Sequence, residues 1–104
     1  MADDRQIRVE EDGQVLARAV VSAADDTGEA HAQVHIASGH LPVGTRRKMA
    51  DAVHEAVVDD SERLSASVPL GDTELVVGLT EHLTEVELRA AGATSIVKGH
   101  VKPR

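Results

Sequence analysis

Alternation of apolar and polar side chains dominates the first third of the chain. Three segments, residues 5–11, 14–23 and 29–37, have the two-residue period of a β-strand. Asp12-Gly13 separates the first two as a hairpin turn, because this pair tolerates the positive φ that tight hairpins need. Residues 24–28 have the composition of a loop. Three consecutive strands with short connections predict an antiparallel meander.

A helical period replaces this alternation between residues 45 and 59. Apolar side chains recur there at i, i+3, i+4, i+7 and i+8, and they form one stripe made of Met49, Ala52, Val53, Ala56 and Val57. Alternation returns in a short strand at residues 64–68, which Pro69 ends. A strand, a crossover helix and a further strand predict a βαβ unit with parallel strands.

The last third predicts a second helix and a closing hairpin. Asp72 can N-cap a helix, and the apolar positions assigned to that helix are Leu75, Val76, Leu79 and Leu83. Gly78 lies inside it and costs roughly 1 kcal/mol relative to alanine, so a short helix is expected. Residues 85–89 and 94–101 alternate around the turn Ala91-Gly92-Ala93, which predicts two antiparallel strands.

The predicted fold class is α+β. It is a single mixed β-sheet of about six strands with two helices, in the order βββ-α-β-α-ββ. We expect one domain over residues 1–104, with residues 1–4 disordered. In the third strand, His31, Gln33 and His35 are expected to face away from the core.

Composition narrows the possible partners and cell compartments. The chain has no aromatic residue, so its core must be built from smaller apolar side chains and should be thin. It has no cysteine, which excludes disulfides and zinc–thiolate sites. A formal net charge of −7 argues against a nucleic acid partner. The absence of a long apolar run argues against a membrane partner, and we expect a cytoplasmic protein.

The first predicted helix has its charges at the ends that the helix macrodipole disfavours. Arg46, Arg47 and Lys48 lie in the first turn, whereas Asp59 and Asp60 lie at the end. One hypothesis is an anion site, because cations next to the free N–H groups of a helix N-terminus attract negative groups. The alternative is a solvated helix end, on which Asp51 pairs with Arg47 and Lys48.

Other patterns in the sequence carry less chemistry. Residues 39–45 are spaced like a phosphate loop, but Thr45 stands where that motif has its lysine. Of the six histidines, His31 and His35 are four residues apart. On a strand this separation is about 13 Å, too far for the pair to share an ion directly. We therefore predict no metal site.

The order of elements resembles the later part of the GCN5-related N-acetyltransferase fold, beginning at its second strand. In that family the loop from the meander into the next helix holds the coenzyme A pyrophosphate with backbone N–H groups. Here that loop is residues 38–45. The resemblance implies acyl-coenzyme A as the candidate ligand, with candidate binding residues Gly39, Val43, Gly44, Thr45, Arg46 and Arg47.

The sequence also departs from that family at functional positions. With the loop's first glycine set on Gly44, Leu41 occupies an Arg or Gln position, and Arg46 occupies a position for a small residue. The chain has no tyrosine to serve as the general acid. Glu29, His31 and His35 are the candidates for a base. The family's first strand-and-helix segment has no counterpart, so the prediction leans against an enzyme.

Two functions follow from these observations. The first is a domain that binds an acyl-coenzyme A or another phosphate-bearing ligand without efficient catalysis. The alternative is a non-catalytic homodimeric module that interacts with proteins. We expect the two helices on opposite sides of the sheet, with Leu16 and Val20 on a sheet face that is left bare under the meander.

Overall fold

The computed structural model describes residues 4–104 of the chain. Of the segment expected to be disordered, only Asp4 is described, and it has no regular secondary structure. The elements follow in the order β1 (Arg5–Glu11), β2 (Gln14–Ser22), β3 (Glu29–Ile36), α1 (Thr45–Val57), β4 (Arg63–Pro69), α2 (Thr73–Thr80), β5 (Leu83–Ala91) and β6 (Thr94–Val101). The predicted order βββ-α-β-α-ββ is confirmed.

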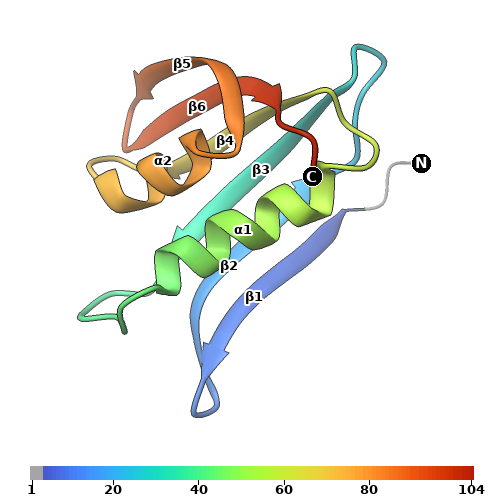
Figure 1. The fold of residues 1–104 in the computed structure, drawn as a ribbon. Helices are drawn as coiled ribbons and strands as arrows, with labels where there is room; N and C mark the ends of the chain where they lie inside the picture. The colour runs from blue at the N-terminus through green and yellow to red at the C-terminus, as the bar shows by residue number, and fades with distance from the viewer. Residues whose placement is uncertain (1–3) are drawn as a thin grey trace.

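The strands form one mixed sheet (Figure 1), in the order β1-β2-β3-β4-β6-β5. β3 and β4 are parallel, and the other neighbouring strands are antiparallel. Asp12 and Gly13 make the predicted hairpin turn, with φ of 53° and 78°. The predicted meander and βαβ unit are therefore both present.

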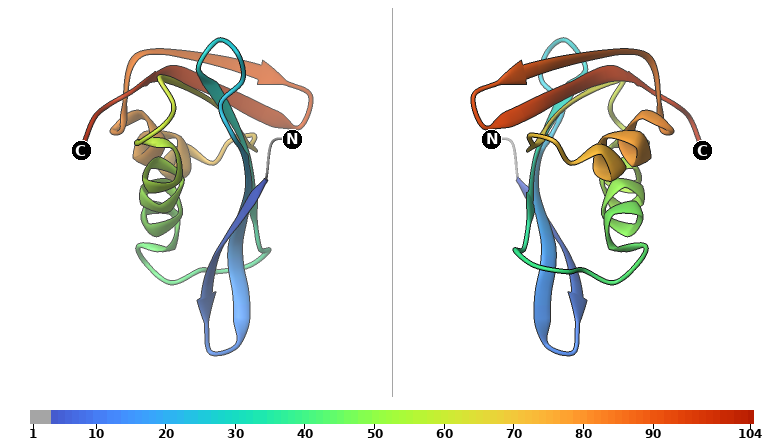
Figure 2. Two further views of the ribbon diagram at one scale, coloured as in Figure 1. Left: turned by 90° about the vertical axis from the view of Figure 1, so that its right-hand side faces the viewer. Right: turned by 90° about the vertical axis from the view of Figure 1, so that its left-hand side faces the viewer.

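Both helices lie on the same face of the sheet (Figure 2), so the expectation of opposite sides is wrong. The physical reason is a single core. Small side chains of the central strands line this face, and Met49, Val53 and Leu75 from the helices pack into the same buried cluster. The other sheet face, which we call the open face, carries Leu16 and Val20, as predicted, together with Arg18, His31 and His35.

Close packing of the two helices explains the glycine within α2. A Cβ on Gly78 would lie 3.1 Å from the Cβ of Ala50, a fully buried residue of α1. The absence of a side chain at Gly78 thus lets α1 and α2 approach each other. α2 ends at Thr80, and Leu83 belongs to β5 rather than to this helix. Leu83 is nevertheless 4% exposed and contributes to the core.

The last residues of the chain run along α1. Lys102 donates its backbone N–H to the carbonyl of His82, and its own carbonyl lies 2.7 Å from Nε2 of His54. Arg104 then forms ion pairs with Glu55 and Asp59 near the carboxyl end of α1. Positive charge at this helix end is favoured by the macrodipole.

None of the helices in the described residues is long and apolar enough to cross a membrane.

Candidate functional site

The parallel strands β3 and β4 separate at their carboxyl ends. Their pairing runs from Glu29 opposite Arg63 to Gln33 opposite Ser67. β3 then continues to Ile36 and β4 to Pro69 without further pairing between them. An open cavity of about 620 Å³ lies at this gap, lined by Ile36, Ala37, Gly39, Arg46 and the residues from Pro69 to Glu74. Ligands of open α/β sheets commonly bind outside the carboxyl ends of strands.

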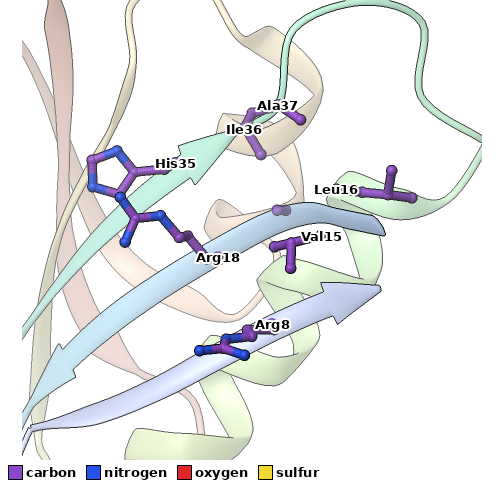
Figure 3. A pocket seen from close by; sticks show the side chains of 8 residues that line it. Arg8, Val15, Leu16, Arg18, His35, Ile36 and Ala37 are labelled. Carbon is purple, nitrogen blue, oxygen red and sulfur yellow. The ribbon is translucent and has the colours of Figure 1, made fainter. Parts of the chain in front are cut away.

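A second cavity, of about 470 Å³, adjoins the first on the open face (Figure 3). Ile36 and Ala37 line both cavities. Arg8, Arg18 and His35 form a row across three adjacent strands, because Arg18 pairs with Arg8 on one side and with His35 on the other. The rest of the lining is mostly apolar and comes from Val15, Leu16, Ala17, Ile36 and Ala37.

The loop from β3 into α1 is the predicted ligand loop. Gly44 is the N-cap of α1 with φ of 90°, a left-handed conformation that suits glycine. Thr45 is buried, and both its backbone N–H and its hydroxyl donate to the carbonyl of Pro42. Val43, by contrast, is fully exposed.

The guanidinium groups of Arg46 and Arg47 both pair with carboxylates of the protein, so they are not free cations next to the helix N-terminus. Nε of Arg46 donates to both carboxylate oxygens of Asp72, each at 2.9 Å. Arg47 makes two bonds to Glu81, at 2.7 and 3.1 Å. The alternative hypothesis, in which Arg47 pairs with Asp51 of the same helix, is wrong about the partner, which is Glu81. The compensating acids come from the ends of α2.

Asp72 has two roles at the gap. Its Oδ1 accepts a hydrogen bond from the backbone N–H of Leu75, which confirms the predicted N-cap of α2. The same carboxylate holds Arg46, and its side chain is only 10% exposed. Sequence spacing gave no sign of this second role, because the two residues are 26 positions apart. Asp72 thereby fixes Arg46 at the rim of the cavity.

The ion pair between Arg47 and Glu81 shifts the titration of both groups. Hydrogen bonds and charge attraction from Arg47 lower the pKa of Glu81 below its ordinary value. The same contacts raise the pKa of Arg47. Both side chains are largely exposed, so this pair contributes little to stability.

The three candidate bases occupy two places on β3: Glu29 and His31 lie together near its amino end, and His35 lies near its carboxyl end. Glu29 is at the amino end of the strand, where it lines a third cavity of about 400 Å³ with Arg63, Glu85, Glu87, Lys98, Gly99 and His100. Nε2 of His31 lies 3.6 Å from the nearer carboxylate oxygen of Glu29. His35 lies near the opposite end and lines the second cavity. The structure does not bring the three together at the gap.

No family model matches the sequence, and no curated protein matches it. Solved structures do match. They include a GNAT-family acetyltransferase from Streptococcus pneumoniae, with 12% identity and a TM-score of 0.66 over 94% of this chain and 66% of that one. Another is yncA from Salmonella typhimurium, solved with its cofactor acetyl-CoA, with 10% identity and a TM-score of 0.65 over 97% and 65% of the two chains.

A third similar structure is the ribosomal-protein-alanine N-acetyltransferase from Brucella melitensis. It has 15% identity and a TM-score of 0.59 over 93% of this chain and 67% of that one. The chain thus has a GCN5-related N-acetyltransferase-like fold. It spans about two thirds of the length of these structures.

Proposed function

We propose that this chain is a small acetyltransferase-like domain that binds an acyl-coenzyme A or another phosphate-bearing ligand at the gap between β3 and β4, without efficient acyl transfer. One observation carries the proposal. The two parallel strands separate after Gln33 and Ser67, and the cavity at their ends is bordered by the loop into α1. One of the structures with this fold was solved with acetyl-CoA.

Backbone groups of the loop are the proposed phosphate ligands. Between Ala37 and Thr45, the hydrogen bonds within the described residues use only the N–H groups of Ala37 and Thr45. The N–H groups of Gly39, Val43 and Gly44 therefore have no protein acceptor in that part of the chain, and backbone N–H groups near a helix start favour anions. Arg46 lies at the rim of the cavity, where Asp72 and Glu74 offset its charge, so the loop N–H groups are the main proposed contacts to an anion.

Exposed apolar side chains suit the non-polar arm of such a ligand. Leu70 is 54% exposed and lines the cavity. Val43 lies in the loop into α1, and its full exposure brings no stability to the folded chain. Ile36 and Ala37 line the cavities on both sides of β3, so they offer a path from the gap to the open face.

Efficient catalysis is not part of the proposal. The chain has no tyrosine. Glu29 lies seven residues before Ile36 on β3, which corresponds to about 23 Å of strand. His35 is the candidate base nearest to the gap, because it precedes Ile36 directly. A base at the far end of the strand cannot reach a group bound at the gap.

Isothermal titration with acetyl-coenzyme A tests the proposal. We expect one equivalent to bind. Arg46→Glu should weaken binding at least tenfold, because it reverses the rim charge. The matched control is Arg89→Glu, which makes the same charge change on an exposed residue of β5. Asp72→Asn retains a capping oxygen while it removes the charge that holds Arg46, so its binding should be as tight or tighter. No heat at millimolar ligand would refute the proposal.

The alternative function is a non-catalytic homodimeric module, and a specific observation favours it. Within residues 4–104, no second layer covers the open face. Val20 and Ile96 lie half-buried there in one row across the sheet, joined by Gln33 and Ser67. A second copy, or another protein, would bury these apolar side chains. The two functions predict different behaviour in solution, since only the second requires association of the chain.

A further inference from the structure

A loop aspartate reaches a glutamate and a histidine of β3 on the open face. One ligand atom from each of Asp25, Glu29 and His31 lies within 4.8 Å of the others. Nε2 of His31 is 3.6 Å from Oδ2 of Asp25 and 3.6 Å from Oε1 of Glu29. We propose that these three side chains form a binding site for a divalent transition metal ion, with zinc as the best fit.

The spacing of the three side chains differs from that of ordinary histidine–carboxylate pairs. Elsewhere in this chain, His82 lies 2.7 Å from Asp51 and His100 lies 3.0 Å from Glu85, both hydrogen-bonding distances. His31 stays 3.6 Å from both of its carboxylates, which is too long for a hydrogen bond. Zinc bonds of about 2.0–2.1 Å in a tetrahedron place neighbouring ligand atoms about 3.4 Å apart. The two distances from His31 are close to this value, and all three ligand atoms lie within 4.8 Å of one another.

Asp25 is fixed in place by donors on its other oxygen. Its Oδ1 accepts hydrogen bonds from the hydroxyl of Thr27 at 2.6 Å, from the backbone of Thr27 at 2.8 Å and from the backbone of Glu29 at 3.2 Å. Oδ2 therefore remains directed at His31.

The donor types agree with the proposed class of ion. One imidazole nitrogen and two carboxylate oxygens form a mixed set that suits zinc and its first-row neighbours better than calcium, which prefers oxygen alone. Three protein ligands leave a position for water, as in zinc sites that are not purely structural. The residues are Asp25-x3-Glu29-x-His31, and spacing between histidines alone could not reveal them.

Lys98 gives the proposal a second, opposite test. Its ammonium group lies 4.0 Å from Oε2 of Glu29, the oxygen that faces away from His31. A cation at this distance repels a metal ion at the site. Removing the charge in Lys98→Met should therefore tighten metal binding, whereas a purely ionic role for Glu29 predicts no gain.

Titration of the untagged chain with zinc chloride, followed by calorimetry, tests the site, and the absorption spectrum of bound cobalt(II) reports the ligand set. We expect one equivalent to bind, with at least a tenfold loss in His31→Gln and in Asp25→Asn. The matched controls His35→Gln, on the same strand and face, and Asp26→Asn, in the same loop, should change the affinity less than twofold. Circular dichroism checks that each variant is folded.

Several results would overturn the site. One is the absence of binding up to millimolar zinc, and another is equal zinc affinity of His31→Gln and the parent chain. A third is a loss of zinc affinity only in His82→Gln, which would place the ion at the stacked pair of His54 and His82. The proposal does not depend on coenzyme binding. Acetyl-coenzyme A titrations of the same variants therefore separate the failure of one idea from the failure of the other.

Discussion

Arg46 and Arg47 put positive charge at the end of α1 where the macrodipole disfavours it, and α2 supplies the compensation. Asp72 forms an ion pair with Arg46, and Glu81 forms one with Arg47, so each end of α2 binds one arginine. The sequence showed the unusual charges but not their partners, since pairing over 26 and 34 positions depends on how the helices pack. Asp25 was missed for a different reason: it lies only four residues before Glu29, and its approach to His31 depends on the conformation of the loop between β2 and β3.

The ion pair between Arg47 and Glu81 gives a pH-dependent prediction. Because the folded-state pKa of Glu81 is lowered, the pair stabilises the fold above the ordinary glutamate value of about 4.5, and this contribution is lost as the pH falls through the folded-state value. The free energy of unfolding of Glu81→Gln should therefore be slightly below that of the parent at pH 7. The difference should shrink in acid.

Urea unfolding at a series of pH values measures this difference. Glu62→Gln, which removes an exposed carboxylate from the connection between α1 and β4, is the control. A gap between Glu81→Gln and the parent that stays constant from pH 7 to pH 3 would contradict the assigned role of the pair.

At the scale of elements, periodicity predicted the helices and strands whose pattern is visible in the local sequence. The meander, the helical stripe of α1 and the closing hairpin were all predicted, because each rests on alternation or on a 3.6-residue period. The boundary after α2 was wrong at Leu83. An apolar residue that continues a helical stripe can equally begin a strand. Leu83 is the first residue of β5, and its side chain is buried in the core. Only packing distinguishes the two.

The contact between α1 and α2 gives a second prediction. Gly78→Val places a branched side chain where even a Cβ meets Ala50 at 3.1 Å, so it should lower the free energy of unfolding by about 1–3 kcal/mol. Val77→Ala, at a residue of the same helix that is 47% exposed, should change it by less than about 0.5 kcal/mol. Thermal or urea unfolding followed by circular dichroism measures both.

A partial rescue of Gly78→Ala by Ala50→Gly would confirm that the two helices touch at this point. Equal stability of Gly78→Val and the parent would show instead that the helices can move apart without cost.

At the scale of the whole molecule, the two helices cover one side of the sheet and leave the other side bare (Figure 2). The sequence predicted a bare face but divided the helices between the two sides. Both arrangements are consistent with the same alternation pattern. An apolar strand position shows that its side chain is buried, but it does not show which helix packs on it. Which helix does so follows from the single shared core.

The bare face yields a prediction about association. If it pairs with a second copy, sedimentation at micromolar concentration should give about twice the 11.0 kDa mass of the chain. Val20→Glu on the open face should then shift the protein to monomer, because it buries a charge at the interface. Val77→Glu, on the helical side, is the matched control. A single 11.0 kDa species for the parent would exclude the homodimeric module.

The position of Arg104 determines where a label attached after this residue would lie. Arg104 forms ion pairs with Glu55 and Asp59, so it lies against α1 on the helical side of the sheet. A dye or a surface anchor joined after Arg104 would project from the helical layer. It would leave the row of Arg8, Arg18 and His35 and the cluster of Asp25, Glu29 and His31 accessible to ligands in solution.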